Sequence, residues 1–398
     1  MDRALLLKLA EEYGTPLYVF DGDAFEKRAA QVKSALGKDV GLCFSIKANP
    51  FLLACLPKEI EKLEVCSPGE LEICKSVGVR PESVIYSGVN KTYPNVCDAM
   101  DFGVGTLTAE SPLHLAHIQR YAKKTGLKAR VLLRLTGGDQ FGMDGEEIRR
   151  IICQREAFPQ VEFVGLHYFT GTQKRRAALI EKELEYASDF AGKLRQDYGF
   201  TVERLEYGAG LFADYYGEDP DTAELALLEQ VAPALRWTGE RFSLTVELGR
   251  FLASPCGAYI TTVEDVKRNR QRLFAIANGG AHQVNYDGLM FAAAPPPLTM
   301  LNRVPELSAP VSIYGSLCSR GDLLAKDVPM EIRPGDVLCF QRAGAYAVTE
   351  GMALFLSRDM PAVVLWSKDG GARLMREAME TAPLNTPLIC RKDGGHGQ

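Results

Sequence analysis

The sequence has 398 residues, of which 46% are hydrophobic and 24% charged, and its net charge is -5. This length is too great for one hydrophobic core and predicts two domains. The composition is that of a globular protein, and the charge gives no indication of a nucleic-acid partner. No apolar run is long enough to span a membrane, and residues 1–14 predict a short amphipathic helix and not a signal peptide.

The cysteines, one basic run and the C-terminal tail each allow one further expectation. The ten cysteines include no C-x-x-C pair, so we expect no zinc site, and reduced thiols in a cytoplasmic protein. The run Lys174-Arg175-Arg176 predicts a solvated face at the start of a helix. Residues 386–398 are expected to be a disordered tail.

From residue 40 onward, short apolar runs alternate with amphipathic stretches of helical periodicity. Strands alternating with helices indicate a parallel sheet, and eight units in about 210 residues fit a (β/α)8 TIM barrel. The eight predicted strands are residues 40–48, 63–67, 84–88, 104–109, 129–135, 163–170, 204–210 and 244–250.

After Pro255 the pattern changes to apolar runs that are separated by Gly and Pro and lack long helical partners. This change predicts an antiparallel β domain, a barrel or a sandwich. We therefore expect a TIM barrel over residues 22–254 and a β domain built from residues 1–21 and 255–385.

Several reactive side chains fall at the predicted carboxyl ends of the barrel strands, where TIM barrels place their active sites. A lysine at the end of a buried strand, such as Lys47, is costly unless it is paired or covalently used, and a desolvated lysine readily forms a Schiff base. Taken singly, Lys47 can reach solvent, His167 can be a core histidine, and Glu247 can pair with Arg250. Their position on one face favours a shared site.

Taken together, these segments resemble the fold-type III pyridoxal-phosphate decarboxylases, a family that includes the diaminopimelate, ornithine and arginine decarboxylases. The resemblance runs from Tyr18 to Trp366 and implies that Lys47, within SIKANP (45–50), binds pyridoxal phosphate as a Schiff base. Further segments similar to family motifs are EVCSPGEL (64–71), QFGMD (140–144), HYFTGTQ (167–173), YGAG (207–210), ELGR (247–250) and GAY (344–346).

The resemblance also assigns contacts to the cofactor. It implies that His167 stacks on the pyridine ring, that Glu247 contacts the ring nitrogen and that Tyr346 reaches the phosphate. Two positions depart from the family, since Ala209 replaces a glycine and Leu248 a proline. The complete implied set of cofactor-binding residues is Lys47, His167, Thr172, Gly208, Ala209, Gly210, Glu247, Gly249, Arg250 and Tyr346.

In the β domain, LCSRGD (317–322) resembles the segment that gives Cys318 and Asp322 to the active site of a neighbouring subunit. The resemblance therefore implies a homodimer with shared active sites. It also implies a decarboxylation that passes through a quinonoid, which a protonated ring nitrogen favours, and in which Cys318 is the proton donor.

The substrate-defining positions differ from those of diaminopimelate decarboxylases. Ser319 stands where those enzymes usually carry glutamate, and residues 273–302 contain no arginine or lysine. The segments QFGMD (140–144), TGTQ (170–173), GGAHQ (279–283) and LC (317–318) resemble those of decarboxylases of siderophore and aminoglycoside pathways, which act on amino-acid units joined to citrate or a carrier protein. The expected substrate contacts are Asp322, Ser319, Arg320 and Gln283, although GGAHQ can equally form a β-turn.

The expected substrate is thus an amino acid or an amino-acid conjugate, with an acyl-carrier protein as a candidate partner. Three alternatives stay open: a diaminopimelate decarboxylase proper, an amino acid racemase and a non-catalytic regulatory homologue. A racemase would typically place an arginine, and not Glu247, at the ring nitrogen. Regulatory homologues commonly lose the lysine or the cysteine, and here Lys47 and Cys318 are both present.

Overall fold

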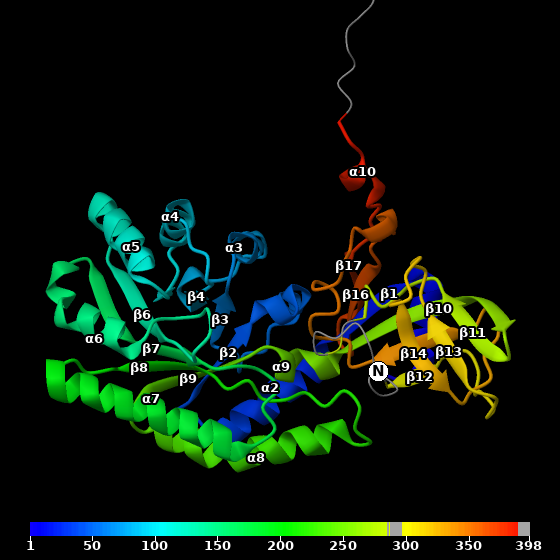
Figure 1. The fold of residues 1–398 in the computed structure, drawn as a ribbon, viewed down its shortest axis with the longest axis horizontal. Coiled ribbons are helices and arrows are strands. Elements are labelled where there is room, and N and C mark those ends of the chain that lie inside the picture. Colours follow the sequence, from blue (N-terminus) through cyan, green and yellow to red (C-terminus); the bar gives the residue numbers. More distant parts are fainter. Residues whose placement is uncertain (285, 287–296, 389–398) are drawn as a thin grey trace, which may run out of the picture.

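The structure is a computed structural model that describes residues 1–284, 286 and 297–388. Eight parallel strands close into a barrel in chain order, which confirms the predicted TIM barrel (Figure 1). The last strand pairs with the first, with Cys43 opposite Glu247. The barrel strands are β2 (Gly41–Ser45), β3 (Lys62–Val65), β4 (Val84–Tyr86), β5 (Thr106–Ala109), β6 (Ala129–Leu135), β7 (Val161–Phe169), β8 (Arg204–Gly208) and β9 (Ser243–Leu248).

Helices surround this barrel and cover its strands with their apolar faces (Figure 1). In the helix that follows β6, for example, Ile148, Ile151 and Ile152 are buried while its glutamates and arginines face outward. The barrel helices are α2 (Gly22–Leu36), α3 (Pro68–Ser76), α4 (Tyr93–Phe102), α5 (Pro112–Thr125), α6 (Gly145–Cys153), α7 (Ala177–Tyr198), α8 (Pro220–Gly239) and α9 (Arg250–Ala253).

Six of the eight predicted strands end earlier than the apolar runs suggest, and two of these ends place a candidate site residue outside its strand. β2 ends at Ser45, and Lys47 lies in the 3-10 turn Ile46–Ala48 that follows it. Asn49 then caps the next turn, because its side chain accepts a hydrogen bond from the amide of Phe51. Arg250 likewise lies outside β9, as the first residue of α9. Both side chains therefore stand at the carboxyl-terminal mouth of the barrel.

The remaining strands form a second, mostly antiparallel sheet beside the barrel (Figure 1). Two of its pairings are parallel, β1 with β16 and β11 with β13, which the expectation of a purely antiparallel domain did not include. Its strands are β1 (Leu17–Asp21), β10 (Gly257–Asn269), β11 (Arg272–Ala277), β12 (Leu298–Met300), β13 (Val311–Tyr314), β14 (Leu323–Val328), β15 (Val337–Gln341), β16 (Ala362–Ser367) and β17 (Gly371–Arg376).

The two ends of the chain lie with this second sheet. The predicted N-terminal helix is α1 (Arg3–Tyr13), whose leucines join a small core with β1 and β16. At the other end, α10 (Ala382–Asn385) extends away from the sheet, and residues 389–398 of the predicted tail lie outside the described residues (Figure 1). Within the described ranges, none of the helices has the length and apolar character needed to cross a bilayer.

Backbone contacts join the second sheet to the mouth of the barrel. The amide of Tyr346 donates to the carbonyl of Ala48 at 2.7 Å, and Asn49 Nδ2 donates to the carbonyl of Gly344 at 2.8 Å. Gly344 has no room for a side chain, since an added Cβ would lie 1.9 Å from the carbonyl oxygen of Ala253. These contacts place Tyr346 beside Lys47 although 299 residues separate them in sequence (346 minus 47).

Candidate functional site

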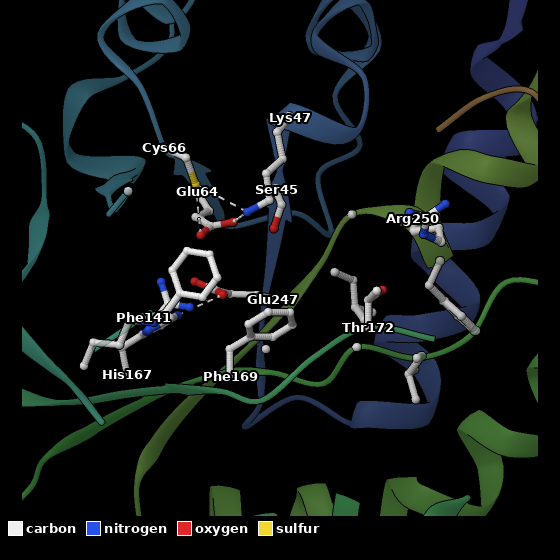
Figure 2. A pocket seen from close by; sticks show the side chains of 18 of the residues that line it. Ser45, Lys47, Glu64, Cys66, Phe141, His167, Phe169, Thr172, Glu247 and Arg250 are labelled. Atoms are coloured by element: carbon white, nitrogen blue, oxygen red, sulfur yellow. Dashed lines mark hydrogen bonds and ion pairs between the residues drawn. The ribbon is translucent and has the colours of Figure 1, made fainter. Parts of the chain in front are cut away.

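A cavity of about 370 Å³ opens at the carboxyl-terminal mouth of the barrel (Figure 2). Every barrel strand except β5 contributes to its wall, directly or through the residues that follow it. Nine of the predicted site residues line it: Lys47, His167, Thr172, Gly208, Gly210, Glu247, Gly249, Arg250 and Tyr346.

Lys47 is paired within this cavity. Its Nζ lies 2.6 Å from Glu64 Oε2 and 3.3 Å from Cys66 Sγ, and Cys66 Sγ lies 3.2 Å from Glu64 Oε1 (Figure 2). Glu64 comes from β3 and is buried, whereas 42% of the Lys47 side chain is exposed to the open space. The amine is therefore held at the wall by one carboxylate and remains accessible from the cavity.

Charge and burial act against each other in this pair. Burial by itself raises the pKa of Glu64, but the neighbouring Lys47 cation and its hydrogen bond lower that pKa to about 2. Burial lowers the pKa of Lys47, whereas the Glu64 carboxylate opposes it and holds that pKa well above its usual value. Without a ligand, Lys47 and Glu64 thus form an ion pair at neutral pH.

His167 on β7 and Glu247 on β9 meet across the floor of the cavity. His167 Nε2 lies 3.1 Å from Glu247 Oε2, and both side chains are buried (Figure 2). Their other polar atoms, His167 Nδ1 and Glu247 Oε1, have no hydrogen-bond partner among the described residues. Buried polar atoms are normally satisfied, so these two indicate that a bound group completes the site.

The opposite end of the cavity is formed by backbone and by Arg250. Gly210 has φ of 59°, and an added Cβ would lie 2.1 Å from the carbonyl oxygen of Gly171, so this position admits only glycine. Arg250 Nη1 lies 2.9 Å from the hydroxyl of Tyr215, and its guanidinium lies 4.5 Å from the ring centroid of Tyr346. A cation and turns of exposed backbone amides are suited to an anionic group.

The other predicted residues do not line the cavity in this chain. Ala209 is fully buried beneath the glycine loop, and Cys318, Ser319 and Arg320 are exposed on the second sheet. Asp322 is buried and accepts hydrogen bonds from the amides of Ala281 and Leu317, at 2.6 and 2.7 Å.

Gln283 is likewise an interior residue. Its side-chain oxygen accepts from the Tyr259 hydroxyl at 2.5 Å and its amide donates to the carbonyl of Asp359 at 3.3 Å. Within one chain it therefore supports the loop that contains GGAHQ, and its side chain does not face the cavity of Lys47.

Sequence reasoning missed several residues of the cavity wall. Glu64 and Cys66 were visible at the end of a predicted strand within EVCSPGEL, but their approach to Lys47 depends on the register of β2 and β3. Arg134 on β6 also lines the cavity, where it pairs with buried Glu110 at 3.2 Å and lies against the ring of Phe141. An arginine inside an apolar strand was the available signal for this contact.

Comparison with known proteins identifies the family. A family model described as "Pyridoxal-dependent decarboxylase, pyridoxal binding domain" matches residues 23–254. The chain belongs to the pyridoxal-dependent decarboxylases. It is therefore an amino acid decarboxylase, a carboxy-lyase, that uses pyridoxal phosphate as cofactor.

Relatives of this decarboxylase span nearly its whole length. It is 28% identical over 404 residues to L-glutamyl-(BtrI acyl-carrier protein) decarboxylase from Niallia circulans, which covers 94% of both chains. It is 27% identical over 390 residues to a diaminopimelate decarboxylase from Aquifex aeolicus, which covers 94% of this chain and 91% of the relative. The crystal structure of AQ1208 from Aquifex aeolicus superposes with a TM-score of 0.83, at 27% identity and over 96% of this chain and 94% of that one.

The cavity of the decarboxylase fits pyridoxal phosphate. A primary amine on Lys47 is available to an aldehyde, and the partnerless oxygen of Glu247 can accept the N–H of a pyridine ring. At the far end, the Gly208 to Gly210 loop and Arg250 can receive a phosphate. The amine, the carboxylate and the anion-binding end thus match the three polar parts of the cofactor.

Proposed function

We propose that this enzyme removes the α-carboxyl group of an amino-acid unit that is attached to a larger carrier, with pyridoxal phosphate bound covalently through Lys47. The observation that carries the proposal is the meeting of Lys47, His167 and Glu247 in one cavity. When bound, the cofactor supplies an electron sink for the electron pair that carbon dioxide leaves behind.

The residues of the cavity divide the work of binding. Glu247 would accept the ring N–H with its unpartnered Oε1 and would keep the ring nitrogen positively charged, while His167 holds Oε2 at 3.1 Å and would lie against the ring. Glu64 orients the amine of Lys47 through its 2.6 Å contact. Thr172, the Gly208 to Gly210 loop, Arg250 and Tyr346 bind the phosphate end.

The proton that replaces the carboxyl group comes from Cys318 in this proposal. Cys318 is exposed and does not line the cavity of its own chain, so it acts in the site of a second subunit. Asp322, Ser319 and Arg320 then approach the same site, and buried Asp322 shapes their loop through its backbone contacts.

The choice of a conjugated substrate rests on the polar groups that the chain offers and lacks. Ser319 cannot hold a distal ammonium group as glutamate would, and no positive side chain lies in residues 273–302 to hold a distal carboxylate. Losing one such charged contact costs about 2–5 kcal/mol, roughly a 30- to several-thousand-fold loss in kcat/KM. The relative from Niallia circulans, whose name specifies a glutamyl acyl-carrier protein, supports the same choice.

A comparison of kcat/KM tests this substrate class. We expect glutamyl-loaded acyl-carrier protein, or another amino-acid conjugate, to exceed free meso-diaminopimelate by roughly 30-fold or more. As a matched control, Ser319→Glu should raise activity on diaminopimelate and leave activity on the conjugate within about twofold. If free diaminopimelate is the better substrate of the unaltered enzyme, the second candidate, diaminopimelate decarboxylation, replaces this proposal; the diaminopimelate decarboxylases among its relatives favour that candidate.

A further inference from the structure

A second buried ionic cluster lies beside the cavity and centres on Glu183 of α7. Glu183 Oε2 accepts hydrogen bonds from Lys174 Nζ and from the Tyr207 hydroxyl, each at 2.6 Å. Its Oε1 accepts from the Thr170 hydroxyl at 2.5 Å. Both oxygens are therefore satisfied, and Glu183 itself is not part of the cavity wall.

The three donors lie in or directly before the two loops at the anionic end of the cavity. Thr170 and Lys174 flank the loop after β7, and Tyr207 immediately precedes the glycine loop after β8. The backbones of these loops also interlock, because the Lys174 amide donates to the carbonyl of Gly210 at 2.9 Å. One carboxylate thus ties together both loops that carry Thr172, Gly208 and Gly210.

The expectation of a solvated face at Lys174-Arg175-Arg176 is confirmed for Arg175 and Arg176, which are exposed, and is wrong for Lys174. Lys174 is buried and paired with Glu183, and burial lowers its pKa against the opposing effect of that carboxylate. Removing two charges from water costs about as much as their attraction returns, so such a pair contributes little net stability. The effect of the Lys174–Glu183 pair lies in favouring one arrangement of the loops after β7 and β8.

We propose that Glu183 is a positioning residue for the cofactor phosphate, acting through the loops after β7 and β8. This inference rests on the proposed placement of the phosphate at those loops. It predicts that loosening either connection to Glu183 weakens the binding of pyridoxal 5'-phosphate but not of pyridoxal, which lacks the phosphate. A change that only destabilised the fold would weaken both ligands alike.

Two variants release one loop each without leaving a charge buried and alone. Tyr207→Phe removes the hydroxyl at the glycine loop, and Thr170→Val removes the hydroxyl at the loop after β7. Tyr168→Phe is the matched control, because it removes a tyrosine hydroxyl from β7 and leaves the hydrogen bonds of Glu183 intact. Lys174→Met combined with Glu183→Gln removes both charges together.

The measurement is the dissociation constant of each ligand for the full-length, cofactor-depleted chain. We expect each single variant to bind pyridoxal 5'-phosphate roughly tenfold more weakly, and the charge-free double variant more weakly still, with pyridoxal within about twofold. Variants that keep the preference for the phosphate form, or that weaken both ligands equally, would overturn the role of Glu183. An unaltered chain that binds both ligands equally would instead refute the proposed phosphate loops.

Discussion

Three buried glutamates lie inside the barrel, and the pKa values of two of them are shifted in opposite directions. Glu64 is held ionised by Lys47, with its pKa lowered to about 2. Glu206 on β8 has its pKa raised well above the usual value, by burial and by the charges of Glu247 and Glu64. The pKa values of Glu64 and Glu206 are therefore shifted in opposite directions, whereas Glu247 lies beside His167, with 3.1 Å between Oε2 and Nε2.

Replacement of Glu247 tests the role of its charge. Glu247→Gln keeps the shape of the side chain but cannot stabilise a positive ring nitrogen, so we expect kcat to fall by roughly 100-fold or more. Glu206→Gln is the matched control: the raised pKa of Glu206 favours its neutral acid form, which an amide resembles, and we expect kcat within about threefold of the unaltered enzyme. Steady-state kinetics with saturating cofactor decide it, and equal losses in both variants would remove the special role of Glu247.

At the scale of elements, the loops at the strand ends carry the site, and glycine determines their course. Gly210→Ala should weaken cofactor binding at least tenfold, because φ of 59° and the 2.1 Å approach to Gly171 exclude a side chain. Gly192→Ala on α7 is the control, since an added Cβ there meets nothing within 4 Å, and it should stabilise the protein by roughly 0.5–1 kcal/mol. Cofactor titration and thermal unfolding of both variants measure these effects, and unimpaired binding in Gly210→Ala would contradict the assigned loop.

The strands of the barrel were predictable from sequence, and the reason is local. Each apolar run corresponds to one strand, and β6 (Ala129–Leu135) has the predicted bounds, because buried parallel strands are continuously apolar. The turn at Lys47 was not predictable, since it depends on contacts of Ala48 and Asn49 with the distant second sheet. The parallel pairing of β1 with β16 is likewise a property of residues about 345 positions apart.

In the candidate site, too, local sequence predicted residues at strand ends but not contacts between residues that are distant in sequence. Motifs at strand ends predicted Lys47, His167 and Glu247, which lie in one cavity. The burial of Lys174 could not be predicted from its basic neighbours. Its partner Glu183 lies nine residues later within α7, and the two side chains meet only once that helix has packed. Under the proposed function, Cys318 approaches Lys47 of a second subunit, and local sequence cannot place that subunit.

At the scale of the whole molecule, the proposal requires two subunits for one active site. Lys47→Ala and Cys318→Ala enzymes should each be nearly inactive, but a mixture that exchanges subunits should recover up to about a quarter of full activity, since half of the dimers carry one intact site. The assay is carbon dioxide release after exchange has been verified. If the mixture recovers no activity, the two residues do not act across subunits. If Cys318→Ala is fully active and Cys66→Ser loses activity, the proton donor lies in the same chain as Lys47.

Lys47 is the residue proposed to hold the cofactor. Borohydride trapping followed by peptide mass spectrometry tests this role most directly. Reduction of the cofactor-loaded enzyme should attach a pyridoxyl group to Lys47 alone, and Lys47→Ala should yield no labelled peptide. Lys91 provides an internal comparison, because it is a buried lysine whose amine donates to the carbonyl of Gly88 in the cavity wall and lies 3.8 Å from Glu110. A pyridoxyl group on Lys91, or an active enzyme without any labelled lysine, would contradict the account.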